Sequence, residues 1–275
     1  PVGCTTMATL ACFHAHPDDE SIATGGVMAK AKEEGHRVVL VVATRGERGE
    51  IQPDVLAEGE QLWERRVKET AAAAEVLGVD RVEFLGYEDS GMMGEPTNDL
   101  PGTFWTADLD EAADRLAAIL RDERVDVLTV YDEHGNYGHP DHIQVNRVGH
   151  LAAERAGIPR VLEATMDRDF IREGMAEAAE LGDLPDDFEP PEHTEDSPFG
   201  SPGEVITHEV DVTGFVDQKR RALSAHASQV PADSFFLAMD DDAFQRAFGQ
   251  EWFIDPSTPR APGAPRVTDL FEGMP

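Results

Sequence analysis

The chain has little lysine and far fewer basic than acidic residues. It contains 23 basic residues against 55 acidic ones, so its formal net charge at pH 7 is −32. Its only lysines are Lys30, Lys32, Lys68 and Lys219. Nucleic acids and anionic membranes recruit proteins through clustered Lys and Arg, so neither is an expected partner. The acidic excess predicts a highly solvated surface whose self-repulsion is weakened by salt.

Cysteine is scarce, and long hydrophobic runs are missing. Cys4 and Cys12 do not imply a disulfide framework, and Cys12 lies in an apolar run where a buried thiol is expected. No stretch reaches the roughly 18 to 20 apolar residues that cross a bilayer. Residues 1–6 lack the charged and apolar regions of a signal peptide, so Met7 is a candidate natural start. We therefore expect a cytoplasmic protein.

Buried strand patterns alternate with helical ones along most of the chain. Strands are predicted over 9–14, 38–43, 82–85, 125–131 and 161–164, and helices over 22–34, 61–77, 108–121 and 141–156. Alternation of this kind predicts an α/β fold with right-handed crossovers. We expect a Rossmann-like, mostly parallel sheet with helices on both faces, followed by a smaller C-terminal α+β portion.

The chain is predicted to divide into three ranges. Residues 7–166 form the Rossmann-like catalytic core. Residues 167–204 form a flexible acidic loop region, because 182–204 is rich in Asp, Glu and Pro and has few apolar anchors. Residues 205–275 complete the same domain with a strand over 205–212 and a helix over 215–227.

Two clusters of histidine and carboxylate follow two of the predicted strands. His16-Pro17-Asp18-Asp19-Glu20 comes after the first strand, and His139-Pro140-Asp141-His142 comes after the strand at 125–131. The carboxyl ends of parallel strands meet at one edge of the sheet, where ligands bind. Imidazole and carboxylate are the usual non-thiol zinc ligands, and a catalytic zinc takes three protein ligands. The two clusters together predict a metallohydrolase with one ion per chain.

Spacing within the clusters suggests different roles for their members. His16 and Asp19 lie three residues apart around a tight turn, so both can face one ion, and His142 can supply the third ligand. Asp18 cannot easily point the same way, which leaves it free to take a proton from metal-activated water. His139, as an imidazolium, could stabilise an oxyanion or protonate a departing amine.

Some of these residues also have simpler explanations. Asp141 is placed to hydrogen-bond a histidine and raise its pKa, but it could also be a cap at the start of a helix. Glu20 is expected to orient a neighbour rather than to bind metal. Either cluster alone would be weak evidence. Their occurrence after two strands of one predicted sheet favours the metal site.

The paired motifs AHPDDE and GHPDH resemble those of the LmbE-like, or PIG-L, family of zinc-dependent N-deacetylases. The resemblance continues through residues 44–47, 66–69, 89–92 and 225–229, covers most of the chain and is weakest across 167–204. Within that family the chain is most similar to the mycothiol branch. That branch contains N-acetylglucosaminyl inositol deacetylases and mycothiol S-conjugate amidases.

The resemblance implies a role for each matched position. It implies that His16, Asp19 and His142 are ligands of Zn²⁺, with Fe²⁺ as an alternative, and that Asp18 is the general base. It also implies a charged His139 with Asp141 as its partner, and Tyr137 as a mobile contact of the oxyanion. Arg66 and Asp89 match groups that hold sugar hydroxyls. Glu47 is a candidate carboxylate at the rim of the site. Arg66 could instead be a solvated helix cation, Asp89 a turn residue and Glu47 a simple loop acid.

The expected function is metal-dependent deacetylation of an N-acetylglucosamine-type small molecule. Ala23 stands where the amidase subgroup carries a lysine, which weakens the amidase alternative without excluding it. Deacetylation of another small glycoconjugate also stays open. A metal- or nucleotide-binding module without turnover is the non-enzyme alternative. No Gly-x-Gly-x-x-Gly follows the first strand, and Asp18 and His139 would be unnecessary in a simple binder. A homo-oligomer is compatible with the sequence.

Overall fold

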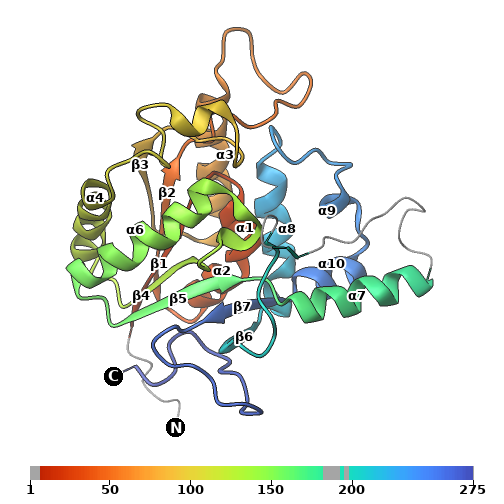
Figure 1. Cartoon of the computed structure of the whole chain (residues 1–275). Helices are drawn as coiled ribbons and strands as arrows, with labels where there is room; N and C mark the ends of the chain where they lie inside the picture. Colours follow the sequence, from red (N-terminus) through yellow and green to blue (C-terminus); the bar gives the residue numbers. More distant parts are fainter. Residues whose placement is uncertain (1–6, 182–192, 195–197, 275) are drawn as a thin grey trace.

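One seven-stranded sheet organises the protein, with strand order β3-β2-β1-β4-β5-β7-β6 (Figure 1). The computed structural model describes residues 7–181, 193–194 and 198–274. The strands are β1 (Thr9–His14), β2 (Arg37–Thr44), β3 (Arg81–Tyr87), β4 (Val127–Tyr131), β5 (Arg160–Thr165), β6 (His208–Asp211) and β7 (Gln250–Ile254). The first five are mutually parallel, whereas β7 is antiparallel to β5 and β6. The predicted Rossmann-like, mostly parallel sheet is confirmed.

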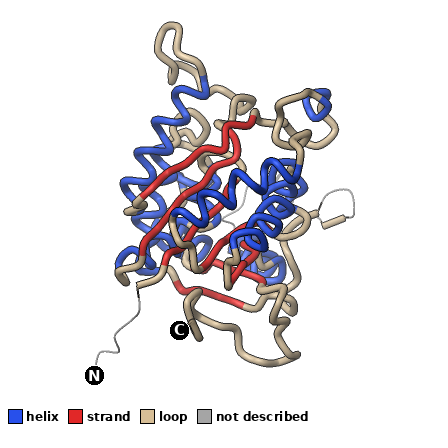
Figure 2. Tube along the Cα trace, turned by 90° about the vertical axis from the view of Figure 1, so that its left-hand side faces the viewer, coloured by secondary structure: helices blue, strands red, loops and turns tan. Residues whose placement is uncertain are grey.

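Helices cover both faces of the sheet (Figure 2). They are α1 (Asp19–Ala23), α2 (Gly25–Glu33), α3 (Leu62–Leu77), α4 (Leu109–Asp122), α5 (Gly135–Gly138), α6 (Pro140–Ala156), α7 (Arg168–Leu181), α8 (Val216–Ala225), α9 (Phe235–Ala238) and α10 (Asp241–Phe248), with short 3-10 turns at Pro96–Asp99 and Thr213–Phe215. Side chains of β1 alternate between the two layers. Ala11 and Phe13 pack with α4 and α6, while Leu10 and Cys12 pack with α2, α3 and α8.

The helix predicted over 22–34 is divided in two. Thr24 has φ −137° and ψ 9°, which ends α1 and precedes α2. The carboxylate of Glu251, on β7, accepts the backbone N–H groups of Gly26 and Val27 at 2.8 Å each and so starts the second helix. A Cβ on Gly26 would lie 2.5 Å from Val212, so only glycine fits this close approach. The break depends on partners more than 180 residues away in sequence.

Helix α7 occupies the first part of the range 167–204, for which the sequence suggests a loop. Phe170 in its first turn packs against Trp252 of β7, with ring centroids 5.0 Å apart, and this contact gives the helix an apolar anchor. Most of the acidic stretch predicted as a loop, residues 182–192 and 195–197, lies outside the described residues. Within the described part of the chain, no helix has the length and apolarity needed to cross a membrane.

Candidate active site

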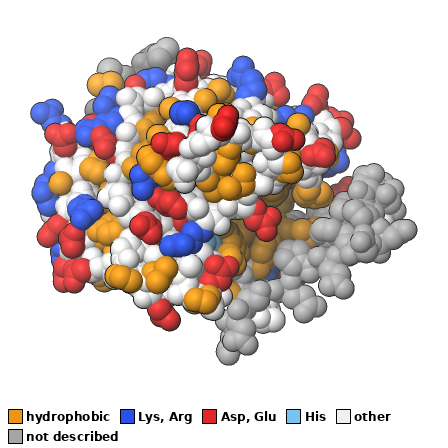
Figure 3. Space-filling view, turned by 90° about the horizontal axis from the view of Figure 1, so that it is seen from above, with side chains coloured by type: hydrophobic (Ala, Val, Ile, Leu, Met, Phe, Trp, Pro, Cys, Tyr) orange, Lys and Arg blue, Asp and Glu red, His pale blue; other side chains and the backbone are white. Residues whose placement is uncertain are grey.

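Both predicted clusters lie at the carboxyl ends of central strands. His16 follows β1, and His139 precedes the first turn of α6, shortly after β4. Strands β1 and β4 are neighbours, and the order of the parallel strands reverses between them. This reversal is the position at which open α/β sheets bind ligands. Viewed from above, this face has hydrophobic side chains near its middle and charged side chains toward its margin (Figure 3).

The three predicted metal ligands meet at this edge. Oδ2 of Asp19 lies 3.4 Å from Nδ1 of His16 and 3.4 Å from Nε2 of His142. Both histidines are buried, and their ring centroids are 5.4 Å apart. Two imidazoles and one carboxylate form a donor set suited to zinc or ferrous iron.

The ring of His139 lies beside the same histidines, with its centroid 4.5 Å from that of His16. Among the described residues, two overlapping groups bring possible ligand atoms within 4.8 Å of one another: His16, His139 and His142, and His16, Asp89, His139 and Asp141. The buried cluster can therefore hold a metal ion.

Carboxylates control the charge of His16. Burial lowers the pKa of its imidazole, but Asp89, Asp141 and Asp19 outweigh that effect and raise the pKa well above 6.5. Nε2 of His16 lies 3.1 Å from Oδ2 of Asp141 and 3.6 Å from Oδ1 of Asp89. Burial also opposes ionisation of Asp19, yet His142 and His16 hold its pKa well below 3.8. The carboxylates around His16 and His142 therefore favour positive charge at the middle of the site.

Asp18, the predicted base, has an unusual backbone and an opposing cation. Its φ is 95°, in a region that non-glycine residues seldom adopt. Its Oδ2 lies 3.2 Å from Nη2 of Arg66. Burial raises the pKa of Asp18 to about 6, and the Arg66 guanidinium opposes the rise. A carboxylate with a pKa in this range can accept a proton near neutral pH and still release it later.

Arg66 is buried rather than solvated, with 3% of its surface exposed. It lies on α3, which begins after the capping box formed by Gln61 and Glu64. Its guanidinium donates to the carbonyl oxygens of Gly46, at 2.9 Å, and Pro17. The guanidinium of Arg66 therefore contacts the turn that carries Asp18, and protein atoms already accept much of its hydrogen-bonding capacity.

The expected pairing of the Asp141 carboxylate with His139 is not formed. Ser90 occupies both oxygens of Asp141 through its backbone N–H, at 2.9 Å, and its hydroxyl, and Oδ2 also contacts His16. At the start of α6 it is the backbone N–H of Asp141 that reaches Nδ1 of His139, at 3.1 Å. His139 therefore caps the helix, because helix N-termini leave backbone donors without partners.

This contact also fixes the protonation state of the His139 ring. Nδ1 accepts a hydrogen bond, so the proton of the neutral ring lies on Nε2. Burial and the positive charge of His16 lower the pKa of His139 to about 3. The hydrogen bond to Nδ1 and the lowered pKa both favour a neutral ring, and the charged histidine that the sequence suggests stays a prediction.

Tyr137 lies on the short turn α5, with its hydroxyl directed to the cluster. The oxygen is 3.4 Å from Nε2 of His142, although 42% of the residue is exposed. Gly135 and Asn136 have φ of 66° and 63°, which turns the chain sharply before Tyr137. Burial of the hydroxyl end and the charge of Asp19 raise the pKa of Tyr137 well above 10, so the group stays a hydrogen-bond donor.

Asp89 and Glu47 come together at the side of the cluster. Oε2 of Glu47 accepts the backbone N–H of Asp89 at 3.1 Å, and Oε1 pairs with Arg45 at 2.9 Å. Oδ1 of Asp89 accepts the N–H of Gly91 at 2.9 Å. Both carboxylates thus join the loops after β2 and β3. The contact of Asp89 with sugar hydroxyls and the place of Glu47 at the rim of the site stay predictions.

Two residues that support the site, Ser90 and Tyr131, are not predicted from the sequence. Ser90 holds Asp141, and the Tyr131 ring stacks on His142 with centroids 4.2 Å apart. The Asp-Ser-Gly turn after β3 is a signal for Ser90, because it follows a strand at the same edge of the sheet. Tyr131 is the last residue of β4, and its apolar neighbours predict a core residue. The sequence therefore gives no signal that its ring contacts His142.

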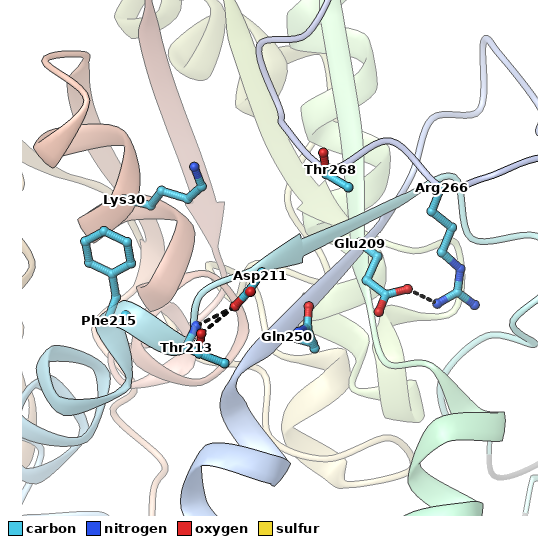
Figure 4. A pocket seen from close by; sticks show the side chains of 9 residues that line it. Lys30, Glu209, Asp211, Thr213, Phe215, Gln250, Arg266 and Thr268 are labelled. Carbon is cyan, nitrogen blue, oxygen red and sulfur yellow. Dashed lines mark hydrogen bonds and ion pairs between the residues drawn. The ribbon is translucent and has the colours of Figure 1, made fainter.

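A separate groove of about 690 Å³ lies between β6 and α2 (Figure 4). It is lined by Lys30, Glu209, Asp211, Thr213, Gly214, Phe215, Gln250, Arg266 and Thr268. None of these is a predicted site residue. Arg266 pairs with Glu209 at 2.7 Å, so at least part of its charge is neutralised within the protein.

The fold and the buried His/Asp cluster define the class of protein. The chain belongs to the PIG-L family, described as GlcNAc-PI de-N-acetylase, whose pattern matches residues 11–153. Both histidine clusters fall within the matched residues.

Relatives that match over nearly their full length share one deacetylase name within this family. The chain is 45% identical over 280 residues to a 1D-myo-inositol 2-acetamido-2-deoxy-alpha-D-glucopyranoside deacetylase of Acidothermus cellulolyticus, covering 98% of this chain and 96% of that protein. It is 42% identical to the protein of the same name from Streptomyces avermitilis, covering 96% and 97% of the two chains.

Solved structures support the fold. The conserved protein TT1542 of Thermus thermophilus matches with a TM-score of 0.58 at 22% identity, covering 94% of this chain and 100% of that one. The N,N'-diacetylchitobiose deacetylase of Pyrococcus horikoshii matches with a TM-score of 0.53 at 24% identity, covering 83% and 73%. At these identities the likeness concerns the fold alone.

Proposed function

We propose that this protein is a metal-dependent deacetylase of 1D-myo-inositol 2-acetamido-2-deoxy-alpha-D-glucopyranoside. The observation that carries the proposal is that His139 and Tyr137 lie beside the donor set of His16, Asp19 and His142, with Asp18 next to Asp19 in the chain. Near-full-length relatives that are named as deacetylases of this compound suggest the substrate. Removal of the acetyl group from the glucosamine nitrogen would yield acetate and a free amine.

We infer that the protein residues divide the proton transfers and the charge stabilisation. Asp18 takes a proton from the water that attacks the amide carbonyl and later returns it to the departing nitrogen. Tyr137 and His139 can each donate a hydrogen bond to the oxyanion, the histidine through Nε2–H. This assignment needs only the neutral ring of His139.

We propose His16, Asp19 and His142 as the ligands of Zn²⁺, with Fe²⁺ as the alternative ion. The chemistry of the donor set fits either ion, since it offers two imidazoles and one carboxylate in a buried cluster. When bound, a divalent metal would supply Lewis-acid polarisation of the amide carbonyl and would make water more acidic. Asp89 and Asp141 then serve to orient His16 through its Nε2 side.

Release of free amine from the N-acetylglucosaminyl inositol substrate, by zinc-loaded protein, tests the function. We expect turnover by the native chain and a loss of about 10²- to 10⁴-fold in kcat for Asp18→Asn, because the base is removed while the shape of the side chain is kept. Zinc binding, measured by titration, should be retained in the variant. No turnover by the zinc-loaded or iron-loaded native chain would contradict the proposal. Cleavage of a mycothiol S-conjugate instead would assign the amidase activity.

A further inference from the structure

The backbone of the base Asp18 is held by a buried carboxylate that the mechanism does not use. The N–H of Asp18 donates to Oε2 of Glu20 at 2.9 Å. Glu20 has no exposed surface, and its other oxygen, Oε1, accepts the hydroxyl of Ser21 at 2.8 Å. A non-glycine residue at φ 95° is strained and persists only where its surroundings enforce it. The Glu20 contact is one such restraint.

The Glu20 carboxylate is itself fixed by a residue from the C-terminal part of the chain. Nε2 of His226 lies 2.6 Å from Oε1 of Glu20, and both side chains are fully buried. His226 is the C-cap of α8, more than 200 residues from Glu20 in sequence. One oxygen of Glu20 thus faces the base and the other faces His226.

The residues after His226 attach the same segment to further parts of the site. Ser228 donates to both oxygens of Glu69, by its N–H at 2.9 Å and its hydroxyl at 2.6 Å. Glu69 lies on α3, three residues after Arg66, the residue that contacts the Asp18 carboxylate. The segment 226–229 therefore joins α1 and α3, the two helices whose residues restrain Asp18.

We propose that Glu20 and His226 form a positioning couple that holds Asp18 in its left-handed conformation and aims its carboxylate at the reacting water. The proposal rests on the proposed function for its catalytic consequence. Both side chains are fully buried, so each would act through Asp18 and not by contact with a substrate. The couple makes the C-terminal segment part of the active centre, although both paired motifs lie in the first 142 residues.

Steady-state kinetics of three variants test the couple. Glu20→Ala removes the acceptor of the Asp18 amide, and we expect kcat to fall about 10²-fold, because small misplacements of a catalytic group have effects of that size. Glu20→Gln keeps an acceptor oxygen and should recover part of this loss. His226→Gln should lower kcat about 10-fold or more, as outer partners of site residues do. KM and zinc affinity should stay near their native values, because the substrate and the metal ligands are untouched.

Glu251→Gln is the matched control. Glu251 is also a buried carboxylate that accepts backbone N–H groups at a helix start, and it pairs with buried Lys219 at 2.6 Å, but it does not touch Asp18. It should lower the unfolding temperature without lowering kcat per folded molecule. Equal losses of kcat in Glu251→Gln and the Glu20 variants would mean that Glu20 has only a structural role, and would overturn the couple.

Two further measurements separate this inference from the proposed function. In an Asp18→Ala background, Glu20→Gln should have no additional effect on the residual rate, and a further loss of the same size would contradict the couple. If the native chain does not turn over the substrate, the proposed function fails, but hydrogen exchange of the Asp18 amide by NMR still decides the couple. Exchange should be faster in Glu20→Ala than in the native chain and Glu251→Gln, and equal exchange would overturn it.

Discussion

Two adjacent carboxylates of one motif have opposite electrostatic environments. Burial raises the pKa of Asp18 to about 6 against the opposing charge of Arg66, while His142 and His16 hold the pKa of Asp19 well below 3.8. Neighbouring groups whose pKa values are pushed apart divide the roles of acid, base and permanent charge. In this motif Asp18 is suited to moving protons, and Asp19 to staying charged beside a metal.

Replacement of Tyr137 tests the predicted contact with the oxyanion. Tyr137→Phe removes the hydroxyl that lies 3.4 Å from Nε2 of His142 and keeps the ring. We expect kcat to fall by about 10- to 10³-fold, because a single donor to an oxyanion has effects up to that range. KM should change little.

The measurement is initial rates of amine release over a range of substrate concentrations. Tyr87→Phe is the control, since the hydroxyl of Tyr87 is buried without a partner in the described residues and its side chain packs in the core layer that contains α4. A rise in KM with unchanged kcat for Tyr137→Phe would show that Tyr137 binds substrate rather than stabilising charge.

At this scale the sequence identifies the residues better than their contacts. The His/Asp motifs predict that His16, Asp19 and His142 meet, because two strand ends must share one edge of a parallel sheet. The partner of Asp141 could not be predicted. Whether its carboxylate or its backbone reaches His139 depends on the start of α6, and Ser90 enters from another loop.

At the scale of elements, α2 depends on a carboxylate from the other end of the sheet. Glu251 accepts two N–H groups at the start of α2, and Lys219 of α8 completes its partners at 2.6 Å. Both charged side chains are buried, so removal of either one leaves the charge of the other buried and unpaired.

Lys219→Met should therefore destabilise the fold by about 3–5 kcal/mol, since it leaves the Glu251 charge buried without its cation. Chemical denaturation at neutral pH measures this loss. Lys32→Met is the control, because Lys32 forms an exposed pair with Asp80 at 2.6 Å. Its loss should cost about 1 kcal/mol or less. Equal costs for the two variants would contradict the account of α2.

Sequence patterns predict most of the element order but not the break at Thr24. The strand over 9–14 matches β1 to the residue, because a continuous apolar run between polar turns marks a strand covered on both faces. The segment 22–34 has helical composition throughout, so local preference favours one helix. The division comes from Glu251 and from the close contact of Gly26 with Val212, which no local pattern encodes.

For the whole molecule, the net charge of −32 is the dominant property. Like charges repel one another in the compact state, and ions screen them over about 10 Å at 0.1 M salt. We expect the unfolding temperature to rise as NaCl is increased from about 0.05 to 0.5 M, a range over which the screening length falls several-fold.

Differential scanning calorimetry measures this shift. The same titration near pH 4.4, the pI of the sequence, is the control, because the net charge and the repulsion approach zero there. A rise of the same size at both pH values would show that salt acts by another route, such as general strengthening of hydrophobic burial.

The position of His226 and Glu251 late in the chain has a consequence for synthesis. The N-terminal part emerges first from the ribosome and carries both metal motifs, but Asp18 and α2 receive their last partners from residues 226 and 251. A nascent chain can therefore bring its predicted metal ligands together before Asp18 is held in place. With the proposed couple, hydrolytic competence waits for the segment around His226, so chains that end before it carry both motifs without the restraint on Asp18.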